Sequence, residues 1–233
     1  MAGVRLQELT KHYRRGSETI RALDGVTLDI APGEFVAVVG RSGSGKTTML
    51  DLLGLLLKPT SGALFIDDVE TTKLNDRDRA HMRARKVGFV FQEYNLLSGL
   101  NVLENVTLPL RYVKERNDGR TRAVDLIERV GLSDRIKHRP TELSGGQMQR
   151  AAIARSMVNR PSLILLDEPT GAVDTETAQQ LVDLLKTLNR EENVTIVIVT
   201  HDLDVAGEAR RQIRLKDGKV LSDQRTGQEV SVA

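Results

Sequence analysis

Cysteine is absent from this 233-residue sequence. A chain without cysteine forms neither disulfide bonds nor thiolate metal sites. The sequence therefore excludes a disulfide-stapled secreted domain and a cysteine-ligated metal protein, and it fits a reducing compartment.

Long apolar runs are also missing. The longest candidate, Leu52 to Leu57, is short and contains Gly54, whereas a helix needs roughly 20 apolar residues to cross a bilayer. The start, Met1 to Leu6, lacks the apolar core of a signal peptide. We expect neither a signal peptide nor a membrane span, so that any membrane part must belong to a partner.

The chain has no large excess of one charge sign. Its formal net charge is +2, with 28% charged residues, which gives no strong field to attract nucleic acid. One basic cluster, from Arg77 to Lys86, is interleaved with acidic residues and contains no Phe, Tyr or Trp. Single-strand binding sites combine basic and aromatic side chains. The cluster therefore favours a solvated helix face, and we expect no nucleic-acid partner.

The sequence does contain short runs that are almost entirely apolar. Such runs, separated by helical stretches, are typical of a parallel sheet covered on both faces. The length and the 39% apolar content allow one domain with a sizeable core. We predict an α/β fold with a mostly parallel sheet, whose strands include Val36–Val39, Val87–Phe91, Leu163–Leu166 and Thr195–Val199.

A different pattern occupies the middle of the chain. Residues 101–112, 121–130 and 145–159 read as helices, with no convincing strand between them. We predict a single domain, 1–233, with a core of about 1–92 and 160–225 and an inserted α-helical subdomain of about 93–159. Residues 4–9 and 20–30 predict an N-terminal antiparallel β subdomain, and Asp217-Gly218 predicts the turn of a closing hairpin.

A glycine-rich motif follows the first predicted core strand: Gly40-Arg41-Ser42-Gly43-Ser44-Gly45-Lys46-Thr47, with a helix expected from Thr48. This is the spacing of a phosphate-binding P-loop. Glycines let backbone N–H groups face the phosphates, and the helix directs its positive end at them. Lys46 is expected to reach the β- and γ-phosphates and the Thr47 hydroxyl to bind Mg²⁺.

The P-loop alone does not identify the reaction. GTPases, kinases and helicases share it. The Asn-Lys-x-Asp motif expected of guanine-specific GTPases is absent, which lowers the GTPase hypothesis.

Polar residues follow three of the predicted core strands. Asp167 and Glu168 end one strand, Gln92 another, and His201 lies just after a third. The carboxyl ends of parallel strands form one ligand-binding edge, so we expect these side chains near the P-loop. There Asp167 can hold Mg²⁺, directly or through water, and Glu168 can polarise an attacking water. Taken alone, Gln92 and His201 are ordinary polar residues.

A second motif, Leu143-Ser144-Gly145-Gly146-Gln147, lies downstream. Ser144 can cap a helix whose first amides belong to Gly145 and Gly146. A helix N-terminus without a Cβ beside it is an anion site.

With these motifs in this order, the chain resembles an ABC-type ATPase, the nucleotide-binding subunit of a membrane transporter. The resemblance covers about Val4 to Val220. It identifies the P-loop as Walker A, Gln92 as the Q-loop glutamine, Ser144 to Gln147 as part of the signature, Asp167-Glu168 as Walker B with its catalytic glutamate, Gly171-Ala172-Val173-Asp174 as the D-loop and His201 as the switch histidine.

The resemblance implies a RecA-like P-loop NTPase core that hydrolyses ATP with Mg²⁺. It implies that Tyr13 stacks on adenine and that the P-loop with Thr48, the signature and Asp174 contact ATP. It assigns the metal to Thr47, Gln92 and Asp167, and catalysis to Lys46, Gln92, Glu168 and His201. In this family two copies pair head to tail, and each signature faces the γ-phosphate held by the other copy.

The resemblance extends to a branch of the family. Phe89 to Leu97 and Leu103 to Val106 resemble the macrolide-export and lipoprotein-release branch (MacB/LolD-type). That branch implies a permease with few transmembrane helices and a large extracytoplasmic domain, and a peripheral position on the cytoplasmic face of the inner membrane. Two alternatives are an importer subunit of the same fold and a soluble ABC ATPase of DNA repair or translation. The chain lacks the long coiled coils of the former soluble type and the second domain of the latter.

Overall fold

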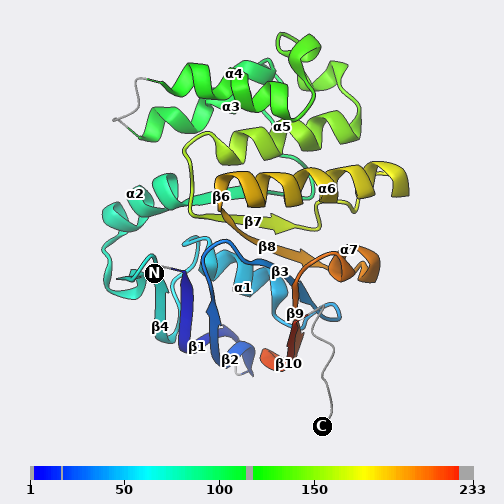
Figure 1. Ribbon diagram of the computed structural model, residues 1–233. Coiled ribbons are helices and arrows are strands. Elements are labelled where there is room, and N and C mark those ends of the chain that lie inside the picture. Colours follow the sequence, from blue (N-terminus) through cyan, green and yellow to red (C-terminus); the bar gives the residue numbers. More distant parts are fainter. Residues whose placement is uncertain (1–2, 17, 114–117, 226–233) are drawn as a thin grey trace.

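The computed structural model describes residues 3–16, 18–113 and 118–225, and within them it contains two sheets and several helices (Figure 1). The larger sheet has the order β10-β9-β3-β8-β7-β6. Its central part is parallel and consists of β3 (Phe35–Val39), β8 (Thr195–Thr200), β7 (Leu163–Asp167) and β6 (Val87–Val90). The predicted parallel strands are confirmed.

A hairpin completes this sheet. Strand β9 (Arg211–Lys216) runs parallel to β3 and antiparallel to β10 (Lys219–Arg225). The turn residues Asp217 and Gly218 have φ values of 49° and 75°, as a type I′ turn requires. The predicted hairpin is confirmed.

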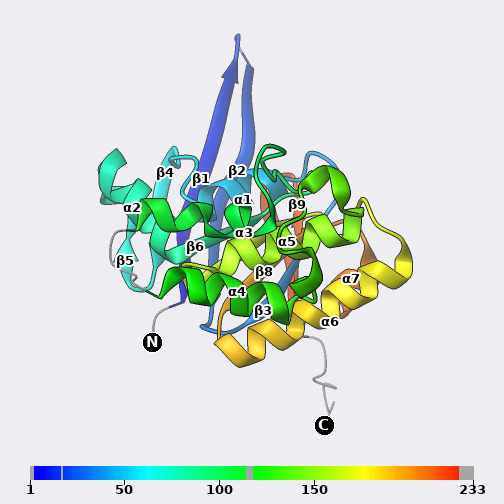
Figure 2. The ribbon, with the colours of Figure 1, turned by 90° about the horizontal axis from the view of Figure 1, so that it is seen from above.

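The smaller sheet is antiparallel, in the order β2-β1-β4-β5. Strands β1 (Val4–Arg15) and β2 (Glu18–Ile30) are longer than predicted and form a hairpin that projects from the body of the protein (Figure 2). Strands β4 (Ser61–Ile66) and β5 (Val69–Glu70) were not predicted. They are short, and only part of β4 alternates in burial, so they leave little periodic signal.

Two apolar cores lie on the two faces of the larger sheet, because successive strand residues point to opposite sides. Val36 belongs to the core that includes helix α1 (Lys46–Leu53), and its neighbour Ala37 belongs to the core that includes α5 (Gly145–Met157) and α6 (Thr175–Glu192). Helices α1 and α5 therefore cover opposite faces of the sheet (Figure 1).

The predicted helical stretch lies together at one end of the molecule (Figure 1). It contains α3 (Val102–Thr107), the 3-10 helix η2 (Leu108–Tyr112), α4 (Gly119–Arg129), short 3-10 turns η3 (Ser133–Arg135) and η4 (Pro140–Glu142), and α5. The predicted helix at 101–112 changes to 3-10 geometry at Leu108, next to Pro109, which lacks a backbone N–H. The proposed subdomain boundaries stay a prediction.

Three further elements complete the fold: η1 (Thr71–Lys73), α2 (Asp76–Lys86) and α7 (Leu203–Gly207). The basic cluster forms most of α2, which has no fully buried residue. In the part of the chain that the structure describes, no helix combines the length and apolarity needed to cross a bilayer.

Candidate functional site

The P-loop connects β3 to α1. The Lys46 ammonium donates to the carbonyl oxygen of Gly40 at 2.8 Å and to that of Arg41 at 3.2 Å. An ammonium has three donors, so these two bonds hold Lys46 over the loop and leave one N–H for a phosphate oxygen.

Glycine is required at particular points of this loop. Gly43 and Gly45 have φ values of 77° and 104°, in a region that favours glycine. A Cβ at Gly45 would lie 2.3 Å from the carbonyl oxygen of Ala22, and one at Gly40 would lie 2.5 Å from that of Leu215. The loop therefore packs directly against β2 and β9, and no Cβ stands beside these backbone amides.

Ser44 supplies an unusual polar atom in the loop. Its side chain is buried, and its Oγ has no hydrogen-bond partner in the described structure. An unpaired buried hydroxyl costs about 1–3 kcal/mol. A phosphate oxygen bound in this loop would offset that cost, as a cradle for phosphate requires.

Asp167 is the last residue of β7 and is partly buried. Burial raises the pKa of its carboxyl, and the negative charges of Glu168 and Asp51 raise it further, while Lys46 opposes them. A bound cation would favour the ionised form, so this environment suits a metal-facing carboxylate.

Glu168 and His201 meet at the carboxyl edge of the sheet, as their positions after β7 and β8 predict. The Glu168 Oε1 lies 2.8 Å from the His201 Nδ1, and its Oε2 accepts a hydrogen bond of 3.1 Å from the Thr200 hydroxyl. The hydrogen bond and charge of Glu168 raise the pKa of His201. The backbone of Glu168 has φ 45°, an uncommon value for a non-glycine residue that often marks a functional position.

Gln92 lies two residues beyond β6 and is exposed. A Cβ at Gly171 would lie 3.5 Å from the Gln92 Nε2 and 3.4 Å from the carbonyl oxygen of Glu168. The strand ends therefore place Gln92 beside the loop that follows Glu168, while Thr47 is exposed in the first turn of α1.

The predicted metal ligands were Thr47, Gln92 and Asp167. Their hydroxyl, amide and carboxylate groups supply oxygen atoms, which Mg²⁺ prefers. Within residues 3–16, 18–113 and 118–225, no group of three or more His, Cys, Asp or Glu residues could hold a metal ion. This suits Mg²⁺, which usually takes one or two protein ligands together with substrate phosphates and water.

Tyr13 lies on the projecting hairpin, where it pairs with Ile20 of β2. Its side chain is exposed, and the Lys11 ammonium lies 5.2 Å from the ring centroid. The P-loop packs on Ala22 of the same strand, so the hairpin brings an aromatic ring to the side of the loop.

The signature residues begin α5 as predicted. The Ser144 Oγ accepts from the Gln147 N–H at 3.3 Å, and the Gln147 Oε1 accepts from the Ser144 N–H at 2.9 Å. This reciprocal capping box fixes the helix start. A Cβ at Gly146 would lie 2.6 Å from the Thr177 Cγ2, so the glycine permits close packing on α6.

Asp174 caps α6 beside the signature. Its carboxylate accepts from the Thr177 N–H at 2.9 Å and from the Thr177 hydroxyl at 2.7 Å. These hydrogen bonds lower the pKa of Asp174. The predicted D-loop and signature are thus packed together through Thr177, whereas the P-loop begins a helix on the other face of the sheet.

Sequence reasoning did not select two residues that organise the site. Thr200 donates to Glu168, and the buried Gln149 donates from its Nε2 to the Pro169 carbonyl oxygen at 2.7 Å. Thr200 ends a core strand, which was a usable signal. The contact of Gln149 is tertiary and leaves no local pattern.

Comparisons with known proteins agree on one family. Residues 23–171 match the family described as "ABC transporter". The chain is 46% identical over 227 residues to the ABC transporter ATP-binding protein MJ0796 of Methanocaldococcus jannaschii, covering 95% of this chain and 97% of that protein. It is 46% identical over 221 residues to the macrolide export ATP-binding/permease protein MacB of Syntrophobacter fumaroxidans, covering 93% of this chain but only 31% of MacB.

A solved structure gives the same result. The dimeric structure of MJ0796 in a post-hydrolysis state, bound to ADP and Pi, matches with a TM-score of 0.87 and 45% identity, covering 96% of this chain and 98% of that chain. The predicted fold class and the predicted resemblance are confirmed. The chain belongs to the ABC transporter family, as an ATPase cassette of the group that includes MJ0796 and MacB.

Proposed function

We propose that two copies of this chain hydrolyse ATP at their shared interface, head to tail, and thereby drive a membrane permease. The strongest support is that one chain carries its P-loop and its signature on helices covering opposite faces of one sheet. In a head-to-tail pair, the α5 N-terminus of one copy faces the γ-phosphate held by the P-loop of the other. The solved MJ0796 structure is itself dimeric.

The P-loop holds the phosphates of ATP. Lys46 binds the β- and γ-phosphates, and the loop amides and Ser44 accommodate the remaining oxygens. Tyr13 stacks on the adenine, and its neighbour Lys11 stabilises the ring. Asp174 connects the two sites, because its α6 N-terminus packs beside the signature.

Glu168 is the general base in this proposal. Its Oε1 takes the proton of the attacking water, and the Thr200 hydroxyl holds the other oxygen in place. His201 lies against Oε1 and contacts the γ-phosphate from the adjoining strand. Thr47, Gln92 and Asp167 hold Mg²⁺, which supplies charge neutralisation of the phosphates.

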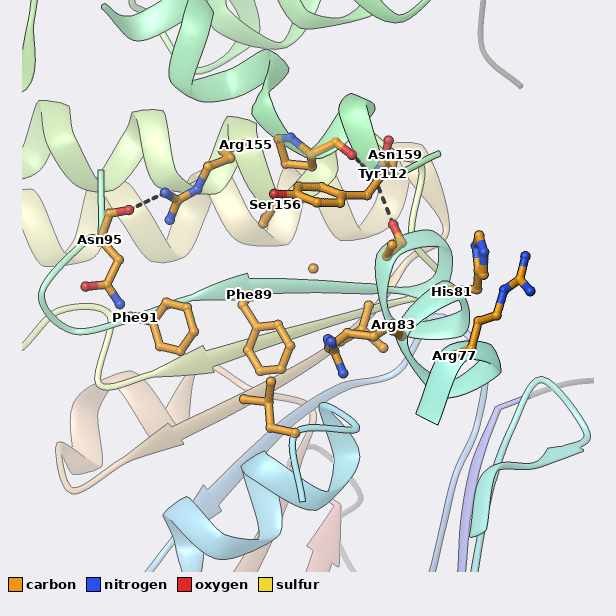
Figure 3. A pocket seen from close by; sticks show the side chains of 16 residues that line it. Arg77, His81, Arg83, Phe89, Phe91, Asn95, Tyr112, Arg155, Ser156 and Asn159 are labelled. Atoms are coloured by element: carbon orange, nitrogen blue, oxygen red, sulfur yellow. Dashed lines mark hydrogen bonds between the residues drawn. The ribbon is translucent and has the colours of Figure 1, made fainter. Parts of the chain in front are cut away.

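A separate groove supports the membrane partner. It has a volume of about 690 Å³ and lies between α2, β6, η2 and α5 (Figure 3). Phe89 and Phe91 form its apolar floor with stacked rings, 5.4 Å between centroids. The exposed apolar side chains Leu56 and Tyr112 border it. Exposed apolar surface gathered in a groove marks a protein interaction site.

The charge of the groove indicates its occupant. Its lining includes Arg77, His81, Arg83 and Arg155 and contains no acidic residue. Arg83 donates to the Leu55 carbonyl oxygen and Arg155 also to carbonyl oxygens, rather than to carboxylates. We therefore assign the groove to a short permease segment that has an apolar face and a carboxylate side chain.

The permease belongs, in this proposal, to the macrolide-export and lipoprotein-release type, with few transmembrane helices and a large extracytoplasmic domain. MacB relatives support this, since their printed name joins an ATP-binding part to a permease, and this chain spans about a third of them. The chain would then lie peripherally on the cytoplasmic face of the inner membrane. Purification from membranes with its bound permease, followed by identification of that permease, separates this branch from an importer.

Mixing two inactive variants tests the composite site directly. A Lys46→Ala chain keeps its signature, and a Ser144→Arg chain keeps its P-loop. A mixed pair contains one site whose two halves are intact, so ATPase activity should appear on mixing, at roughly a quarter of the wild-type level because about half the pairs are mixed and each has one working site. Mixtures as inactive as the separate variants would refute action between copies.

A further inference from the structure

The segment after Gln92 has an uncommon backbone. Tyr94 and Asn95 have φ values of 60° and 49°, which place two adjacent non-glycine residues in the left-handed region. Such residues cost roughly 1–3 kcal/mol each and persist where surrounding structure holds them. Local turns contribute, since Tyr94 donates its N–H to the Phe91 carbonyl oxygen at 3.1 Å.

Arg155 holds this segment from the last turns of α5. Its guanidinium donates to the carbonyl oxygen of Tyr94 at 2.8 Å and to that of Asn95 (Figure 3). Burial lowers the pKa of Arg155, and the structure records no ion pair for it among the described residues. The buried charge is therefore satisfied by these two carbonyl oxygens, which makes the contact hard to replace.

The Tyr94 side chain reaches the opposite end of the same helix. A Cβ at Gly145 would lie 2.9 Å from the Tyr94 hydroxyl oxygen, so that glycine gives the hydroxyl room against the first turn of α5. Gly145 and Arg155 are separated by about 15 Å along a helix that rises 1.5 Å per residue. Tyr94 thus contacts the signature end of α5 through its ring and the far end through its backbone.

We propose that Tyr94 and Arg155 are positioning residues that fix the signature end of α5 relative to the Gln92 segment of the same chain. The role rests on the proposed function, in which that signature serves the ATP of the other copy. Because neither residue belongs to the P-loop, their loss leaves ATP binding by single chains intact. It weakens pairing, since the Ser144 end of α5 must then be ordered when the copies meet.

The test uses the full chain with Glu168→Gln, which blocks hydrolysis and isolates ATP-driven pairing. Dimer formation is measured by sedimentation equilibrium at saturating ATP, and ATP binding by single chains is measured at high dilution. Arg155→Met should weaken pairing by about tenfold or more, because charge-assisted hydrogen bonds are lost. Tyr94→Phe should weaken it by a few fold, and single-chain ATP binding should change by less than about twofold in either variant.

Matched controls separate this role from a general effect on folding. Arg120→Met removes an exposed arginine of α4 and should leave pairing unchanged. Urea unfolding identifies a variant that fails to fold; if Arg155→Met fails, Arg155→Lys and Tyr94→Phe decide the matter. Lysine keeps the charge but cannot bind two carbonyl oxygens with a planar fork, so Arg155→Lys should also weaken pairing.

Two results would overturn the proposal. One is normal pairing in folded Arg155→Lys and Tyr94→Phe chains; the other is an equal loss of ATP binding and pairing. If the parent Glu168→Gln chain itself does not pair with ATP, the composite site fails instead, which distinguishes the two hypotheses.

Discussion

Both carboxylate oxygens of Glu168 are engaged, one with the His201 ring and the other with the Thr200 hydroxyl. A general base must be fixed in this way to meet a water molecule beside the γ-phosphate. The side chain is mostly shielded, whereas His201 is largely exposed. Replacing Glu168 therefore removes a preorganised base, whereas replacing the histidine alters an exposed partner.

The substitution Glu168→Gln should retain ATP binding and slow phosphate release by roughly 10²–10⁴-fold, the range for a lost general base. ATP-bound dimers should then accumulate on size exclusion. Glu128→Gln, an exposed change on α4, serves as the control and should hydrolyse normally. Near-normal turnover in Glu168→Gln would remove Glu168 from this role.

The Glu168–His201 pair should give stability a definite pH dependence. Because Glu168 raises the pKa of His201 in the folded state, the contribution is fully present below the unfolded value of about 6.5 and is lost as pH rises through the raised value. His201→Gln should therefore destabilise the fold more at about pH 6 than at about pH 9, modestly because the pair is screened by solvent. Urea unfolding at both pH values measures this, and equal losses would contradict it.

The sequence was sufficient to group Asp167, Glu168, Gln92 and His201, because each follows a recognisable core strand. The polar bonds that arrange them were not predictable, since Thr200–Glu168 and Gln149–Pro169 join residues far apart in the chain. Local patterns report backbone periodicity, whereas those contacts depend on the finished packing.

At the level of elements, the P-loop and α1 depend on glycine at the point where strand turns into helix. Gly45→Ala would place a Cβ 2.3 Å from the Ala22 carbonyl oxygen at φ 104°. It should lower the free energy of unfolding by about 2 kcal/mol or more and impair ATP binding. Gly207→Ala is the matched control, because its Cβ would meet nothing within 4 Å. Urea unfolding compares the two, and equal stability would contradict the packing argument.

Elements with strong periodicity were predicted well, and short elements were not. The four parallel strands are buried almost throughout, so their apolar runs identify them. Strand β5 has only two residues and no period to detect. The predicted helix at 101–112 gave no sign of its change at Leu108 beyond Pro109 itself, because the transition to 3-10 geometry depends on how η2 packs.

For the molecule as a whole, the basic groove should govern attachment to the permease. The paired substitutions Arg77→Glu and Arg83→Glu place negative charge where an acidic segment is expected, and should reduce recovery of the chain with membranes by about tenfold or more. The pair Arg120→Glu and Arg214→Glu makes the same change in net charge at exposed positions outside the groove and should leave recovery unchanged. Equal losses from both pairs would indicate general electrostatics instead.

The overall family was readable from the motifs, but the arrangement of the surface was not. The groove combines α2, β6, η2 and α5, which lie in separate parts of the chain. Its lack of acidic lining residues emerges only once these elements are packed. Likewise, the motif order does not indicate that α1 and α5 cover opposite faces.

That opposite-face placement of α1 and α5 has a genetic consequence. Each catalytic centre takes one half from each copy, so a polypeptide defective at both Lys46 and Ser144 disables both centres of any pair it joins. Produced alongside an equal amount of the intact polypeptide, it would leave about a quarter of the pairs untouched by random association. Such an allele would be dominant, whereas alleles damaged in different halves would partly complement each other.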